Sequence, residues 1–165
     1  MARVVQVVSG LTGYWQQLDR ARRFLARAEA LNAFNEVEFQ DMMWAFFQNC
    51  WHVNDWVASD RLVPKVKKRI ICQMAEKSPA LQVCQQLCNG TKHLGPMIRK
   101  GRGKRRIAKH QYVEMRIDAG GNAEMDCIVV TGARKKVFGR VLAHQCLAEW
   151  TSILQSQGLS TGRGA

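Results

Sequence analysis

Residues 35–58 read NEVEFQDMMWAFFQNCWHVNDWVA, and this stretch decides the fold. Apolar residues recur along it at steps of three and four, which is the spacing of one helix face. That stripe consists of Phe39, Met43, Phe46, Cys50, Val53 and Val57. Four aromatic residues, Trp44, Phe47, Trp51 and Trp56, place apolar mass on other faces. Because a helix that is apolar nearly all round is buried on several sides, we predict a central helix here.

The same stretch carries a start signal and a polar seam. Asn35 suits an N-cap, and Glu38 stands three residues later in the capping-box position. On a helical wheel Gln48, His52 and Asp55 gather opposite Cys50 and are flanked by tryptophans. The sequence therefore predicts a narrow polar seam on an otherwise apolar helix.

Helices are predicted on both sides of the central one. Residues 14–31 carry leucines and alanines at helical spacing, with arginines elsewhere around the helix. Pro64 suits the first turn of a third helix. We expect Val66, Ile70 and Met74 to face inward from it.

A fourth helix is predicted from Ser78 and Pro79, an N-cap followed by a first-turn proline. Its apolar positions are Leu81, Cys84, Leu87 and Cys88. Gly90 either ends this helix or lets the chain bend before the next residues.

The period then changes from 3.6 to 2. Residues 111–118 alternate, residues 119–122 suit a turn, and residues 124–131 form a second strand, so the pattern predicts a β-hairpin. A lone hairpin is marginal, and we expect it to pack on the helices or pair with the N-terminal valines or a partner chain. The last helix is predicted from about Lys136 to Gln155. Its stripe is Phe138, Leu142, Cys146, Trp150 and Ile153.

The predicted fold class is mainly α: a bundle of about five helices with a β-hairpin inserted before the last helix. At 165 residues the chain suits one domain over 1–165. Residues 95–110 read as a basic linker and 158–165 as a mobile tail. No run approaches the roughly 20 apolar residues of a membrane span, and no secretory signal is evident, so we expect a cytoplasmic protein without membrane contact.

Positive charge is concentrated in one block. The chain has 25 basic and 13 acidic residues, a net charge of +12, and residues 99–109 hold seven of the basic residues and no acid. Such a block attracts polyanions, among them RNA; it also suits a solvated loop. Arg102, Lys104, Arg105 and Arg106 are its candidate phosphate contacts.

The six cysteines read mainly as small buried apolar residues. Cys84 and Cys88 share a helix face and His93 follows, which resembles half of a zinc site. The chain has no C-x-x-C pair, and we predict neither a metal nor a cofactor.

Two groups of polar residues are candidates for chemistry. His52 and Asp55 are three apart, so the carboxylate can orient the imidazole for acid–base catalysis or form a structural hydrogen bond. Asn89, Lys92 and His93 can hold a phosphate, or they can form a helix C-terminus whose cations suit its dipole. We expect all five residues to converge.

Residues 88–93 resemble the motif of HEPN domains, named for higher eukaryote and prokaryote nucleotide binding. That motif is an arginine, a polar residue, three to five further residues and a histidine. Asn89 matches the polar position and His93 the histidine, while Cys88 replaces the arginine. The resemblance implies an all-helical, typically homodimeric protein, often a metal-independent RNase of a defence or toxin module. It implies His93 as acid or base.

Two functions remain open from the sequence. In the first, an RNA-binding or RNA-cleaving protein, His93 acts with His52 and Asp55, and Lys92 contacts phosphate. In the second, a non-enzymatic dimeric interaction module, the same polar residues form a buried structural network.

Overall fold

The structure is a computed structural model that describes residues 13–31, 35–92, 109–117, 123–130 and 135–162. Its elements are α1 (Tyr14–Ala30), α2 (Glu36–Ser59), α3 (Lys65–Lys77), α4 (Pro79–Lys92), β1 (Lys109–Ile117), β2 (Ala123–Val130), β3 (Lys136–Phe138) and α5 (Gly139–Ser156). The predicted fold class, five helices with a hairpin before the last one, is confirmed.

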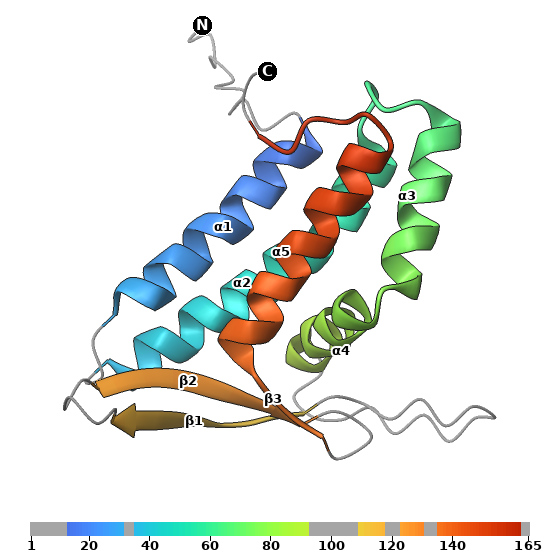
Figure 1. The fold of residues 1–165 in the computed structure, drawn as a ribbon. Helices are drawn as coiled ribbons and strands as arrows, with labels where there is room; N and C mark the ends of the chain where they lie inside the picture. Colours follow the sequence, from blue (N-terminus) through green and yellow to red (C-terminus); the bar gives the residue numbers. More distant parts are fainter. Residues whose placement is uncertain (1–12, 32–34, 93–108, 118–122, 131–134, 163–165) are drawn as a thin grey trace, which may run out of the picture.

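Helix α2 is the centre of the bundle, as its sequence predicts. It contacts each of the other four helices, and every residue of its predicted apolar stripe is buried. Figure 1 shows α1, α2 and α5 side by side, with α3 along one flank and the sheet across one end. Asn35 occupies the N-cap, but its side chain makes no capping bond to the described first turn, so the predicted capping box does not form.

The inward face of α3 differs from the prediction. Val66 is 61% exposed and Met74 is 37% exposed, while Ile71 and Ala75 are buried. The helix is turned by one residue because it contacts α2, α4 and α5 together, and the small side chain of Ala75 suits that close contact. Periodicity predicts that a stripe exists but not which of two adjacent stripes is covered.

A third strand takes the place of the predicted first turn of the last helix. β3 pairs antiparallel with β2, Val137 opposite Val129 and Phe138 opposite Ile128, and α5 begins only at Gly139. The prediction of a helix from Lys136 is therefore wrong by three residues. The reason is that β2 pairs with β1 along one edge and still offers backbone groups along the other.

A buried carboxylate joins the start of α1 to the end of α2. Asp60 is 7% exposed; its Oδ2 accepts a hydrogen bond from Tyr14 N at 3.2 Å, and its Oδ1 accepts one from Leu62 N at 2.8 Å. Tyr14 is the first residue of α1, so Asp60 satisfies an N–H group that the helix itself leaves free.

Replacing Asp60 by alanine is expected to lower the free energy of unfolding by about 1–2 kcal/mol, the usual cost of losing a helix cap. Denaturation followed by circular dichroism measures it. Asp19→Ala is the control, because Asp19 forms only a part-exposed ion pair with Arg22 and its loss should cost less than about 1 kcal/mol. Equal losses in the two variants would show that Asp60 does not act as a cap.

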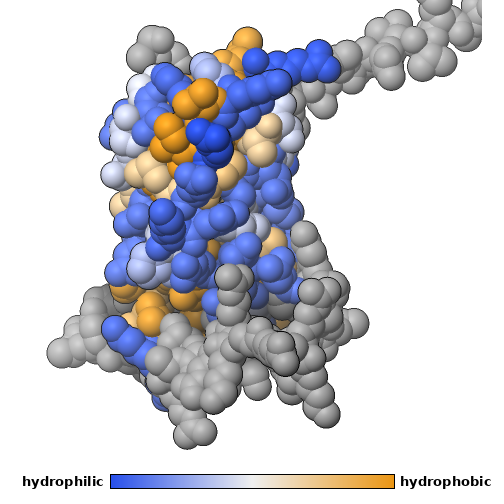
Figure 2. Space-filling view, turned by 90° about the vertical axis from the view of Figure 1, so that its right-hand side faces the viewer, coloured by the Kyte–Doolittle hydropathy of each residue, from blue (hydrophilic) through white to orange (hydrophobic). Residues whose placement is uncertain are grey.

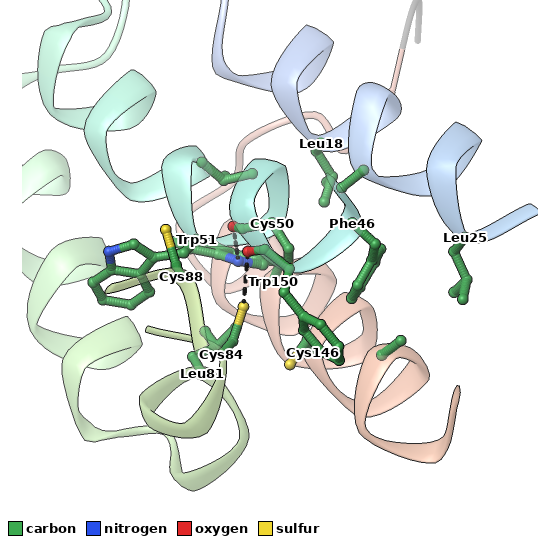
Figure 3. Close-up of a cluster of buried hydrophobic side chains, with 14 of the residues drawn as sticks. Leu18, Leu25, Phe46, Cys50, Trp51, Leu81, Cys84, Cys88, Cys146 and Trp150 are labelled. Atoms are coloured by element: carbon green, nitrogen blue, oxygen red, sulfur yellow. Dashed lines mark hydrogen bonds between the residues drawn. The ribbon is translucent and has the colours of Figure 1, made fainter. Parts of the chain in front are cut away.

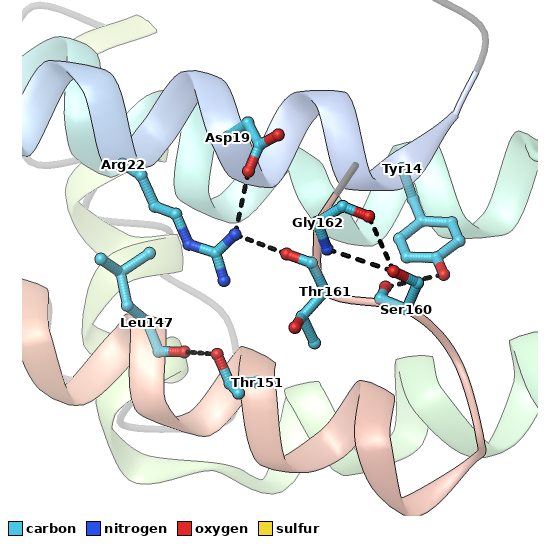
Figure 4. A network of polar contacts seen from close by, with 8 residues as sticks. All are labelled: Tyr14, Asp19, Arg22, Leu147, Thr151, Ser160, Thr161 and Gly162. Carbon is cyan, nitrogen blue, oxygen red and sulfur yellow. Dashed lines mark hydrogen bonds and ion pairs between the residues drawn. The ribbon is translucent and has the colours of Figure 1, made fainter. Parts of the chain in front are cut away.

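The chain after α5 returns along α1 (Figure 4). Tyr14 Oη donates to Ser160 O at 2.9 Å, and Arg22 Nη1 donates to Thr161 O. Lys67 Nζ on α3 donates to Gln157 O at 2.7 Å. These bonds hold Gln157, together with Ser160 and Thr161 of the predicted mobile tail, against two helices. None of the described helices is both long enough and apolar enough to cross a bilayer.

Candidate functional site

The two segments that the sequence singles out do meet, at the contact between α2 and α4. His52 Nε2 lies 3.9 Å from Cys88 Sγ. The imidazole is half-buried and the thiol is fully buried. His52 is 36 residues away from Cys88 in the chain, so only the packing of the two helices brings them together.

Asn89 follows Cys88 and is exposed to solvent. Helix α4 continues through Gly90 to Lys92, so Gly90 does not end the helix. Asn89 is therefore an accessible amide on the last turns of α4, one residue after the thiol that contacts His52.

Asp55 is exposed, and among the described residues no hydrogen bond or ion pair joins it to His52. The imidazole faces α4 and its thiol instead. The predicted His52–Asp55 pair thus remains a matter of sequence spacing, and the contact observed at His52 is with Cys88.

Several predicted site residues lie outside the described part of the chain. They are His93, Arg102, Lys104, Arg105 and Arg106. Lys92 is described only as the last residue of α4. Of the predicted site residues, the structure places His52 against Cys88, the residue that precedes Asn89 in α4.

A narrow apolar hollow lies close by, but it does not include these residues. Its lining residues are Gln40, Met43, Trp44, Phe47, Leu87 and Cys127, and the space is too narrow for a water molecule. We assign no ligand to it.

A second group of close side chains was not predicted from the sequence. Cys50, Cys84 and Cys146, here called the thiol triad, come from α2, α4 and α5. Their Sγ atoms all lie within 4.8 Å of one another (Figure 3). Sequence spacing pairs Cys84 with Cys88 and His93 instead, because those three residues lie within ten positions of the chain. The one signal in the sequence was that each triad cysteine lies within the apolar stripe of its helix.

The pKa values of the three thiols of the triad are shifted in opposite directions. Burial raises the pKa of Cys50 and of Cys84 well above the ordinary thiol value. Hydrogen bonds from Cys50 and Cys84 lower the pKa of Cys146, against the effect of burial. Elsewhere, burial raises the pKa of Cys127 to about 12. All six cysteines fall within the described residues and carry free thiols.

The fold and the site together define a mainly α protein with an imidazole–thiol contact between two helices and three further thiols in its core. Comparison with models of known protein families, with curated proteins and with solved structures finds no match to this chain. The resemblance of residues 88–93 to the HEPN motif therefore stays a prediction.

Proposed function

We propose that the protein binds RNA and cleaves it without a metal ion at the end of α4. His93 and His52 act as the acid–base pair, with Asp55 one turn after His52 on α2, while Lys92 contacts phosphate and Asn89 orients the substrate. The basic block of residues 99–109 binds the RNA backbone through its positive charge.

The observation that carries this proposal is the 3.9 Å approach of His52 Nε2 to Cys88 Sγ. It supports the proposal because it brings an imidazole of α2 to the α4 turn that precedes Lys92 and His93. Asn89 is exposed there, so its amide can reach a solvent-borne ligand. An imidazole and an exposed amide thus lie on neighbouring helices, and Lys92 and His93 follow the amide in the sequence.

The chemistry needs two proton transfers. One imidazole removes the proton of a ribose 2′-hydroxyl as its oxygen attacks phosphorus, and a second proton donor protonates the leaving 5′-oxygen. His93 and His52 are the two imidazoles proposed for these transfers, because histidine is the side chain that most often acts as a general acid or base. Cys88 stands where the HEPN motif has its arginine, so Lys92 supplies the positive charge here.

The test compares three histidine variants on single-stranded RNA in the presence of EDTA. His93→Ala and His52→Ala are expected to slow cleavage by about 10²–10⁴-fold, the usual contribution of an acid–base group. His144→Ala is the matched control, because His144 is an exposed histidine on α5 that contacts Glu29. Unchanged cleavage in His93→Ala, or equal loss in His144→Ala, would refute the proposal.

Binding is tested separately with a variant in which Arg102, Lys104, Arg105 and Arg106 are replaced by glutamine. RNA affinity should fall, and the slope of log affinity against log salt should decrease by about 0.7 for each phosphate group that the variant no longer neutralises. A variant with the affinity and salt slope of the parent protein would show that the basic block is only a solvated loop.

A second candidate function, a non-enzymatic dimeric interaction module, is favoured by one observation. Leu62, in the turn before α3, is 90% exposed, and Val66, in the first turn of α3, is 61% exposed. Figure 2 shows an apolar patch in the upper part of the α3 side, among hydrophilic residues. The test is the oligomeric state of the wild type and of a Leu62→Ser, Val66→Ser double variant. A wild-type dimer that the double variant converts to a monomer would support this candidate over the first, provided that the wild type cleaves no RNA.

A further inference from the structure

The thiol triad gathers three soft ligand atoms at one point in the core. Cys50, Cys84 and Cys146 are each 0% exposed and lie on three different helices. In the neutral form two of the thiols have carbonyl partners: Cys84 Sγ donates to Phe47 O at 3.2 Å and Cys146 Sγ to Ala80 O at 3.5 Å. Apolar packing alone does not require three sulfur atoms at one point.

The spacing of the sulfur atoms fits a metal ion. Thiolates bind zinc at about 2.3 Å, and three of them around an ion at that bond length lie about 4 Å apart. The triad, with all three sulfur atoms within 4.8 Å of one another, needs only small side-chain movements to reach this geometry.

The number of protein ligands at the triad distinguishes Cu⁺ from Zn²⁺ as the ion that it would bind. Among the residues that the structure describes, no further cysteine, histidine or carboxylate joins the three. Structural zinc sites have four protein ligands, and catalytic zinc sites complete their set with water, which has no access to three fully buried thiols. Soft thiolates also select Cu⁺, an ion that accepts three-coordination.

We propose that Cys50, Cys84 and Cys146 form a structural binding site for Cu⁺ that joins α2, α4 and α5. Each cysteine that becomes a thiolate ligand releases one proton to solvent, so the affinity increases with pH. The contacts among the three sulfur atoms, which lower the pKa of Cys146, favour the first of these deprotonations. The indole N–H of Trp150, which donates to Cys50 O at 3.0 Å, lies beside the site.

The test supplies Cu⁺ anaerobically to the whole chain, in competition with a chromophoric Cu⁺ chelator. The wild type is expected to bind one Cu⁺ with thiolate-to-copper charge-transfer absorption. At a free Cu⁺ concentration about 100 times Kd, the Tm of the protein should rise by about 5–10 °C. Failure of the wild type to compete for Cu⁺, or preference for Zn²⁺ supplied in the same way, would overturn the proposal.

Variants locate the site. Cys84→Ala and Cys146→Ala are expected to lower Cu⁺ affinity more than about 100-fold, because the loss of outer-shell groups alone costs about 10–100-fold. Cys127→Ala is the matched control, since Cys127 is equally buried but outside the triad. Retention of Cu⁺ by the triad variants would overturn the proposal.

A measurement on the wild type keeps the test valid if the triad variants fail to fold. X-ray absorption at the copper edge counts the sulfur neighbours of the bound ion. Three are expected, and a nitrogen-rich or two-sulfur environment would place the ion elsewhere in the chain and overturn the proposal.

Discussion

Trp150→Ala is expected to lower the free energy of unfolding by about 3–5 kcal/mol, the range for removing a fully buried tryptophan. Trp150 is 0% exposed and is the largest fully buried side chain described. It lies on α5 where that helix meets α2, and its Nε1 donates to Cys50 O at 3.0 Å (Figure 3). The alanine variant would lose both the apolar packing and this bond, and it would leave a cavity.

Two further variants separate these contributions in denaturation experiments. Trp150→Phe keeps an aromatic ring and loses the N–H group, so it should recover more than half of the loss; the hydrogen bond itself is worth about 0.5–1.5 kcal/mol. Trp56→Ala is the matched control, because Trp56 is half-buried on α2, with the Arg20 guanidinium 6.0 Å from its ring. A loss in Trp150→Ala no greater than in Trp56→Ala would contradict the central place of Trp150.

Gly139→Ala is expected to destabilise the protein by about 1–3 kcal/mol or more, through overpacking. A Cβ atom at Gly139 would lie 1.9 Å from Cys127 Sγ and 3.1 Å from Cys127 O. The direction of the change in stability is informative, because replacing glycine by alanine within a helix ordinarily stabilises the helix by about 0.5–1 kcal/mol. Here the turn from β3 into α5 passes so close to β2 that no side chain fits.

A double-mutant cycle tests this cause. Cys127→Ala removes the sulfur atom that the new Cβ would meet, so Gly139→Ala should cost at least about 1 kcal/mol less in that background than in the wild type. Additivity within about 0.3–0.5 kcal/mol would show that the two sites do not interact and that the loss has another origin.

The elements were predicted correctly from the sequence where a single buried helix face sets the spacing of the apolar residues. The stripe of α2 and the start of α4 at Ser78 and Pro79 follow from spacing and from residues with strong local preferences. Prediction failed where a neighbouring element decides between two local possibilities. Residues 136–138 pair with β2 instead of opening the helix, and α3 buries Ile71 instead of Val66.

The candidate site divides in the same way. Sequence spacing singled out His52 and Asn89, and the packing of α2 on α4 brings the two segments together. Sequence spacing could not show that His52 contacts Cys88 while Asp55 is exposed to solvent. That outcome depends on how α2 is rotated against α4, which three-residue spacing does not fix.

The sequence by itself determined that the chain builds a helical bundle around residues 35–58 and that seven of its 25 basic residues lie in one block without acids. Periodicity and composition are local properties, so each can be read without knowing the neighbours of a residue. Only the tertiary structure decided that Cys50, Cys84 and Cys146 meet at one point. Their meeting requires three helices to pack at the right height and rotation, and residues 34 and 62 positions apart carry no local signal of that arrangement.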